Sequence, residues 1–421
     1  MNIEQTFLAR KDNPLYNTSY PLQPSDWMQY RVDGSLSFDK EGEISFYIHI
    51  PFCKQLCSFC EYTRMVCPDE NAQHQYVNTI NKDVSSFVAT HCNRMKLRGF
   101  DIGGGTPTAL SEANLKNLLQ TFSETLDWME VTPDFEPSIE GTFNTLTKVK
   151  LSMIARSGIK RLSLGVQSTS KNVLCCHHRA SNDVEFMKSW MDKAHDAGIE
   201  KINLDLMYGL KGQDDESIAQ DLNVISQLNP EQVTLYELRT NMIALKELPD
   251  KDALYQQYCL FYDGLIQQGY YARFGQNTFS KSPDDLGVSS YLRSRMIEGI
   301  AYKGFGISAQ SMSSSGVSYN IGKSNDRLRE LLTADSFTEE YTYYLPPKEI
   351  ASKYIAISAY NGSVSLARLE EILKADPLVV YAAQLDYLQK EKLIEIMPNR
   401  IHITPKGFRY YGSVFSLLYV Q

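Results

Sequence analysis

The feature that most constrains the fold is a regular alternation of strand-like and helix-like segments between Glu43 and Leu238. Consecutive strands that are separated by helices form parallel sheets, because a parallel connection needs a long crossover. The sequence therefore predicts a parallel α/β core with helices outside the sheet. The expected strands are residues 43–50, 96–102, 131–140, 159–167, 199–209 and 231–238, and the expected helices are residues 70–91, 111–126, 145–158, 181–198 and 214–228.

Four stretches of unusual composition lie where expected strands end. They read CKQLCSFC, GGGTPT, GVQS and DLMYGL. The carboxyl ends of parallel strands meet at one edge of a sheet or barrel, and functional residues collect there. We therefore expect these four stretches to line one mouth, although they are far apart in the sequence.

The chain divides into four parts. Residues 1–42 form a polar N-terminal extension, residues 43–311 the core with accessory strands, residues 312–345 a connector, and residues 346–421 a small C-terminal domain. The last part contains three amphipathic helical segments followed by a hairpin pattern, as in a winged helix. Its third helical segment has two lysines and two acids, and the whole chain carries a net charge of −8, so we expect no nucleic-acid partner.

The N-terminus places charges on both sides of a short apolar patch, which is not the pattern of a signal peptide. The apolar runs are all shorter than a membrane span requires. We expect a cytoplasmic protein without a membrane partner.

Three of the eight cysteines, Cys53, Cys57 and Cys60, fall within eight residues. In a reducing compartment such a group is typical of a metal site, and thiolates favour zinc, copper(I) or iron–sulfur clusters. Structural zinc needs four ligands, and Cys67 is a candidate for the fourth. An iron–sulfur cubane with three protein thiolates instead leaves one iron open to a substrate or cofactor. Both readings stay open on spacing alone.

The stretch YIHIPFCKQLCSFC resembles the signature of the radical S-adenosylmethionine (SAM) superfamily, and within it the branch of oxygen-independent coproporphyrinogen III oxidase. The resemblance continues through GGGTPT, RLSLGVQS, Arg179 and DLMYGL and covers residues 43–311. It implies a partial parallel (β/α)6 barrel with a small winged-helix-like helical domain at the C-terminus. It also implies a 4Fe–4S cluster on Cys53, Cys57 and Cys60, whose open iron binds SAM for reductive cleavage to a 5′-deoxyadenosyl radical.

The resemblance also implies the cofactor contacts. Tyr47 would lie near the cluster-bound SAM, Phe59 and Ile307 beside adenine, and a second SAM would be held by a further set of side chains. The methionine part would contact Gly104, Gly105 and Thr106, Glu140 would be a further cofactor contact, and the second SAM would contact Gln167, Arg179 and Asp205. Without the resemblance, the glycines indicate a tight turn, and Arg179 indicates a surface ion pair.

The reaction is less constrained. Glu61–Arg64 follows the third cysteine where the oxidase typically has a further cysteine, and GQNTFSK lacks the histidine and Tyr-Trp pair of haem chaperones. These departures favour carbon methyl or methylene transfer to a conjugated or aromatic molecule. The alternatives are oxidative decarboxylation, anaerobic haem degradation and, in another class, a non-catalytic haem-binding or trafficking protein. A zinc-binding regulator with a DNA-reading domain is a third class.

The expected partners are a small-molecule substrate, such as a tetrapyrrole, and an electron donor such as flavodoxin or ferredoxin. Two histidines, His177 and His178, precede Arg179 and follow Cys175 and Cys176. We expect both histidines to be solvated loop residues, although imidazoles can also serve as substrate acids or bases.

Overall fold

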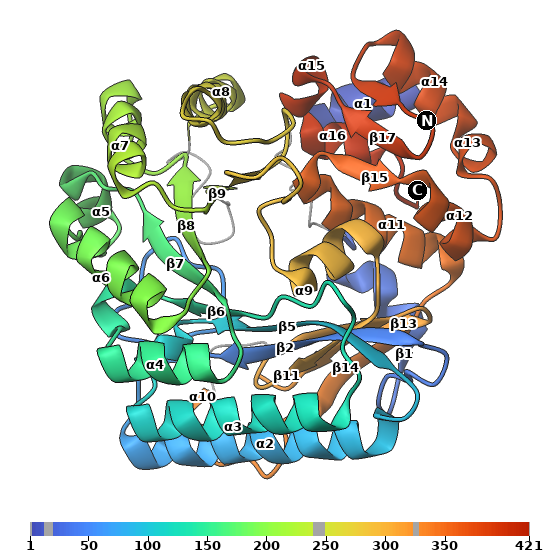
Figure 1. Ribbon diagram of the computed structural model, residues 1–421. Helices are drawn as coiled ribbons and strands as arrows, with labels where there is room; N and C mark the ends of the chain where they lie inside the picture. The colour runs from blue at the N-terminus through green and yellow to red at the C-terminus, as the bar shows by residue number, and fades with distance from the viewer. Residues whose placement is uncertain (1, 12–19, 239–248, 323–327, 421) are drawn as a thin grey trace.

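The computed structural model describes residues 2–11, 20–238, 249–322 and 328–420 (Figure 1). Its centre is a parallel run of strands in the order β11-β2-β5-β6-β7-β8-β9. The six strands that the alternation predicted are present and parallel, and the sheet stays open at both edges. They are β2 (Glu43–Ile50), β5 (Lys96–Gly104), β6 (Ser138–Gly141), β7 (Arg161–Gln167), β8 (Lys201–Tyr208) and β9 (Gln232–Glu237).

Strand β6 is shorter than expected. The prediction covered residues 131–140, but the strand begins only at Ser138. Pro133 and Pro137 lie in the lost part, and proline has no N–H to donate to a strand ladder. The preceding residues make only an isolated bridge between Val131 and Leu97.

The connecting helices begin at side-chain caps. Asp69, Ser111, Thr147, Asp183 and Asp214 each accept a hydrogen bond from the backbone N–H three residues later. Such caps satisfy N–H groups that have no partner inside the helix. The capped helices are α2 (Glu70–His91), α3 (Glu112–Trp128), α4 (Lys148–Arg156), α6 (Val184–Ala197) and α7 (Asp215–Leu228), and α8 (Lys251–Gln267) follows β9. Helices α2 and α3 lie side by side against one face of the sheet (Figure 1).

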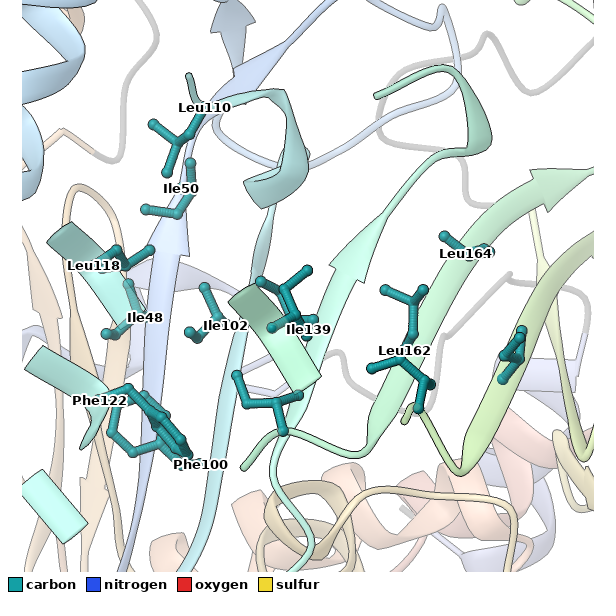
Figure 2. Close-up of a cluster of buried hydrophobic side chains, with 14 of the residues drawn as sticks. Ile48, Ile50, Phe100, Ile102, Leu110, Leu118, Phe122, Ile139, Leu162 and Leu164 are labelled. Carbon is teal, nitrogen blue, oxygen red and sulfur yellow. The ribbon is translucent and has the colours of Figure 1, made fainter. Parts of the chain in front are cut away.

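The alternation along β2 separates the core from the site. Ile44, Phe46, Ile48 and Ile50 are fully buried in the cluster between sheet and helices. Figure 2 shows part of this cluster, in which apolar side chains of β2, β5, β6 and β7 meet Leu118 and Phe122 of α3. Because successive side chains point to opposite faces, Tyr47 and His49 lie on the other face of the sheet.

Antiparallel strands extend the sheet beyond β11 (Tyr302–Phe305). They follow in the order β12 (Gln310–Ser313), β13 (Gly316–Asn320), β14 (Glu339–Tyr344) and β1 (Arg31–Val32), and β10 (Thr278–Ser280) forms the opposite edge. The segment expected as a connector, 312–345, therefore supplies strands of the main sheet. Residues 323–327 of that segment and 12–19 of the N-terminal extension lie outside the described residues.

The C-terminal region has the hairpin and the three helical segments that were expected, together with further short helices and one further strand. Its helices are α11 (Pro347–Ser358), α12 (Leu366–Leu373), α13 (Pro377–Val380), α14 (Ala382–Lys390), α15 (Pro405–Phe408) and α16 (Tyr411–Ser416). The hairpin of β16 (Ile394–Ile396) and β17 (Arg400–Ile403) is joined by β15 (Ser363–Ser365) in a three-stranded sheet.

Helix α1 (Ile3–Lys11) packs on this C-terminal region, so the two ends of the chain lie together (Figure 1). Among the described helices none has the length and apolar character that crossing a membrane requires.

Candidate functional site

The cysteine stretch forms a closed loop at the carboxyl end of β2. Cys53 lies in β3 (Phe52–Cys53), which pairs in parallel with β4 (Met65–Val66). The backbone N–H of Cys67 donates to the carbonyl of Cys53 at 2.8 Å, and that of Met65 donates to Pro51 at 2.7 Å. The pairing holds both ends of the loop against the sheet and leaves the three thiols on one short segment.

Two other stretches reach the sulfur atoms. The Thr106 hydroxyl lies 3.7 Å from Cys53 Sγ, and Arg179 Nη1 lies 3.3 Å from Cys57 Sγ. A Cβ added at Gly105 would come within 2.9 Å of Cys53 Sγ, so the absence of a side chain there permits the approach. Residues that follow β2, β5 and α5 (Lys171–Cys176) therefore meet at the thiols, and Met207 and Leu210 of the stretch DLMYGL pack with Cys57. Three of the four stretches expected at one mouth thus lie at the cysteine loop.

The thiols are shielded from water. Cys53 and Cys57 are buried and Cys60 is partly buried. Burial raises the pKa of Cys53 to about 11 and also raises the pKa of Cys60. A bound iron–sulfur core would supply the positive charge that thiolates need in such surroundings. Three soft donors on one loop, with two polar groups directed at their sulfurs, fit a cluster of this kind.

No three His, Cys, Asp or Glu side chains converge on a position for one metal ion in the part of the chain that the structure describes. The assignment of the three cysteines to an iron–sulfur cluster stays a prediction.

His49 fixes the tail of the cysteine loop, a role that the sequence did not suggest. Its Nε2–H donates to the carbonyl of Thr63 at 2.8 Å, and the Thr63 hydroxyl donates to Ser308 Oγ at 2.9 Å. Burial lowers the pKa of His49 to about 4, so the ring is neutral at physiological pH. Arg64 also donates to the carbonyl of Cys57 at 2.9 Å. The segment Glu61–Arg64 is thus fastened to β2, to the cysteine loop and to the loop after β11.

Glu140 lies against the glycine-rich stretch. The backbone N–H of Gly104 donates to Glu140 Oε2 at 3.0 Å, and a Cβ at Gly103 would come within 2.6 Å of the same carboxyl group. Gly104 has a φ of 114°, and a Cβ there would meet the His49 ring at 2.5 Å. Burial, aided by the negative charge of Asp205, raises the pKa of Glu140 to about 8. Its role as a cofactor contact stays a prediction.

The three side chains expected to hold a second SAM lie around Gly165 of β7, because Gln167 ends β7, Asp205 is on β8, and Arg179 reaches Gly165 from the loop after α5. Gly165 is the register partner of Asp205, Arg179 Nη2 donates to the carbonyl of Gly165, and the Gln167 amide lies beside the same glycine. Gln167 has a φ of 72° at a bulge in β7. Asn203 donates to Asp205 at 2.8 Å, and burial raises the pKa of this carboxyl group to about 6.

The remaining expected cofactor contacts, Tyr47, Phe59 and Ile307, lie in different surroundings. The Tyr47 ring stacks on Tyr291, with centroids 5.5 Å apart. Phe59 packs in a small cluster with Cys57 and Met207, close to the thiols. Ile307 is fully buried in the main core, where its N–H donates to the Tyr76 hydroxyl at 3.1 Å. Their contacts with adenine or methionine stay predictions.

The expectation that both histidines are solvated is wrong for His177, although His178 is exposed. The N–H of Lys211 donates to His177 Nε2 at 3.0 Å, so Nδ1 carries the proton and donates to Ser58 Oγ at 3.1 Å. His177 thereby joins the cysteine loop to the loop after β8. Cys175 and Cys176 are exposed.

The sequence of residues 47–225 matches the Radical SAM superfamily. The heme chaperone HemW of Lactococcus lactis is 28% identical over 383 residues, which are 88% of this chain and 96% of the chaperone. The oxygen-independent coproporphyrinogen III oxidase of Salmonella typhimurium is 29% identical over 272 residues, and the match covers 63% of this chain but only 57% of the oxidase.

Among solved structures, coproporphyrinogen III oxidase (HemN) from Escherichia coli, described as a radical SAM enzyme, aligns with a TM-score of 0.73. The alignment covers 90% of each chain at 24% sequence identity. This similarity confirms the predicted α/β fold. The names of these relatives do not support the methyl or methylene transfer that the sequence favoured.

Proposed function

We propose that this chain is a radical SAM enzyme, with a 4Fe–4S cluster and SAM as its cofactors, that performs radical chemistry on a tetrapyrrole. The match of residues 47–225 to the Radical SAM superfamily supports this proposal. The cluster would be held by Cys53, Cys57 and Cys60. The observation that carries the proposal is the approach of Thr106 and Arg179 to the sulfur atoms of a buried cysteine loop. The tetrapyrrole class is supported by the names of the similar oxidases and chaperones.

When bound, the cluster supplies the electron that cleaves SAM to methionine and a 5′-deoxyadenosyl radical. The chain itself positions the cofactor and excludes water. Gly104 and Gly105 leave space for the backbone to approach the methionine part. Burial raises the pKa of Glu140 to about 8, so its carboxyl group is largely protonated near neutral pH. A bound ammonium group would favour its ionised form and a charge-assisted hydrogen bond.

Anaerobic reconstitution with iron, sulfide, dithionite and SAM tests the proposal. The wild type should become brown and release 5′-deoxyadenosine, and C53A, C57A and C60A should each abolish that release. C92A is the matched control, because Cys92 is also partly buried but lies at the end of α2. Release of 5′-deoxyadenosine from C57A at the wild-type rate would contradict the cluster assignment.

The variant C67A tests the alternative that Cys67 is a fourth metal ligand. The Cys67 thiol is 3.6 Å from the carbonyl oxygen of Ala109, and Cys67 Sγ accepts a hydrogen bond from the Gln73 amide at 3.4 Å, so its contacts are with residues outside the cysteine loop. We expect C67A to keep its iron and its SAM cleavage. Loss of both would make Cys67 a ligand and favour a four-thiolate site.

A haem chaperone is the second candidate. It is favoured by the match to HemW, which extends over 96% of that protein. It predicts tight haem binding without any change in the macrocycle during SAM turnover. Mass spectrometry of haem or coproporphyrinogen III after incubation with the reconstituted protein and SAM distinguishes the two, because the enzyme must alter the tetrapyrrole.

The second SAM and methyl transfer are a finer part of the same proposal. The grouping of Gln167, Arg179 and Asp205 around Gly165 supports a second SAM. Formation of S-adenosylhomocysteine in step with 5′-deoxyadenosine would show that a methyl group is transferred. Its absence, together with an altered tetrapyrrole, would favour oxidation.

A further inference from the structure

Arg295 is a partly buried cation whose surroundings differ from those of Arg293 in the same turn. It lies in a π-helical turn, Arg293–Glu298, that follows α9 (Ser290–Leu292). Such turns occur often at functional sites. Arg293 in the same turn is ion-paired with Asp134 and Glu298. Within the described residues, Arg295 instead contacts aromatic rings and an amide.

Tyrosines surround the guanidinium. Its Cζ lies 4.8 Å from the centroid of the Tyr302 ring and 6.0 Å from that of Tyr291. Nη2 is 3.5 Å from the amide oxygen of Gln310, which already accepts a hydrogen bond from the Tyr302 hydroxyl at 2.6 Å. The Nε atom is buried and has no hydrogen-bond partner among the described residues. A partly buried charge that has no counter-charge among the described residues is unfavourable, so this side chain is suited to bind an anionic partner.

The arginine lies on the face of the sheet that carries the candidate site. In the parallel pairing of β11 with β2, Tyr302 is the register partner of Ser45, so it shares the face of Ser45 and Tyr47. Tyr291 connects the surroundings of Arg295 with the candidate site, since it stacks on Tyr47 and meets the Tyr302 ring edge-on.

Electrostatics agree with this placement. Burial alone lowers the pKa of Arg295, but the hydroxyl groups of Tyr302, Tyr291 and Tyr62 together raise it above its ordinary value. Tyr62 belongs to the tail of the cysteine loop. The guanidinium therefore stays charged and lies within electrostatic reach of the segment that follows the three cysteines.

We propose that Arg295 binds a carboxylate of the substrate and so fixes the substrate beside the cysteine loop. The planar guanidinium can donate two parallel hydrogen bonds to a carboxylate, and its free Nε is one of the donors that such a fork uses. The inference rests on the proposed function, since it names the substrate class as a tetrapyrrole with acidic side chains.

The test uses the reconstituted, SAM-loaded protein under anaerobic conditions and coproporphyrin III as a fluorescent tetracarboxylate probe. R295Q should weaken binding of the probe by about tenfold or more, because a charge-assisted pair is lost. R293Q, in the same turn, is the matched control and should bind as the wild type does. SAM affinity should be unchanged in both variants.

The tetramethyl ester of the probe separates charge from shape. The wild type should bind the ester about as weakly as R295Q binds the acid, and R295Q should not weaken ester binding further. Equal affinity of the wild type for acid and ester would overturn the inference, as would equal loss of both ligands in R295Q. The ester comparison needs no variant, so it remains decisive if R295Q fails to fold.

An error in the proposed function would give a result different from an error in the role of Arg295. If no form of the protein binds a tetrapyrrole, the proposed substrate class is wrong. The rise in melting temperature on addition of benzoate then tests whether Arg295 binds a carboxylate. If benzoate protects the wild type and R293Q but not R295Q, the result supports a carboxylate site at Arg295. If benzoate protects all three proteins equally, or none of them, the inference that Arg295 binds a carboxylate is wrong.

Discussion

At the scale of single residues, the inner face of the parallel sheet holds polar groups that a core would normally exclude. Arg161 is buried and donates to Gln232 at 2.7 Å and to Ser138 at 2.9 Å. Asp101 is buried beside them, with Ser289 donating to Oδ2 at 2.6 Å and Oδ1 left without a partner in the structure. Buried carboxylates of this kind are stabilised in their neutral form.

The raised pKa of Asp101 predicts how the stability of the fold depends on pH. Burial raises its pKa to about 7, so between about pH 4 and 7 the folded state binds more protons at this position than the unfolded state does. Stability from this group is present at low pH and is lost as the pH rises through that window, by about 1.4 kcal/mol for each pH unit between the two pKa values at most. D101N should flatten the dependence of unfolding free energy on pH in this window.

Urea unfolding at several pH values measures the effect of D101N. D127N is the control, because Asp127 lies exposed on α3. An unchanged slope in D101N would mean that Asp101 keeps its charge throughout the window.

At the scale of elements, the sequence predicted the strands and helices that have a clear hydrophobic periodicity. Apolar alternation and helix caps are local signals, so the predicted strands and helices from β2 to β9 were found close to their bounds, except that β6 begins only at Ser138. Strands β13 and β14 were missed because short antiparallel strands without intervening helices give only a weak signal. The glycines and cysteines were found as a motif, whereas His49 and His177 were not, because their partners lie far along the chain or in another loop.

The close approach of the glycine-rich stretch to the cysteine loop gives a second prediction. A Cβ at Gly105 would meet Cys53 Sγ and the backbone of Pro51 and Phe52 at 2.9 Å, so G105A must displace the loop. We expect G105A to fold, with a lower iron content after reconstitution and a loss of SAM cleavage. G42A is the matched control, since nothing lies within 4 Å of a Cβ there. Full iron content in G105A would show that the loop can shift without loss of the cluster.

At the scale of the whole molecule, the two ends of the chain form one unit beside the sheet. The Phe7 ring of α1 lies 5.7 Å from that of Tyr387 in α14 and 6.3 Å from that of Tyr410. Arg10 Nη1 donates to the carbonyl of Ser416 at 2.6 Å, and Lys251 at the start of α8 donates to the carbonyl of Lys11. Helix α1 therefore bridges the C-terminal region and the start of α8, a contact that no local pattern in the polar N-terminal extension reveals.

This bridge gives the last prediction. Phe7 is 6% exposed, whereas its neighbour Leu8 is 51% exposed. F7A should lower the free energy of unfolding by about 3 kcal/mol, because it removes a buried aromatic ring and leaves a cavity. L8A is the matched control and should change it by no more than about 0.5 kcal/mol. Chemical unfolding followed by tyrosine and tryptophan fluorescence measures both, and equal stability of F7A and L8A would show that α1 is not part of the C-terminal core.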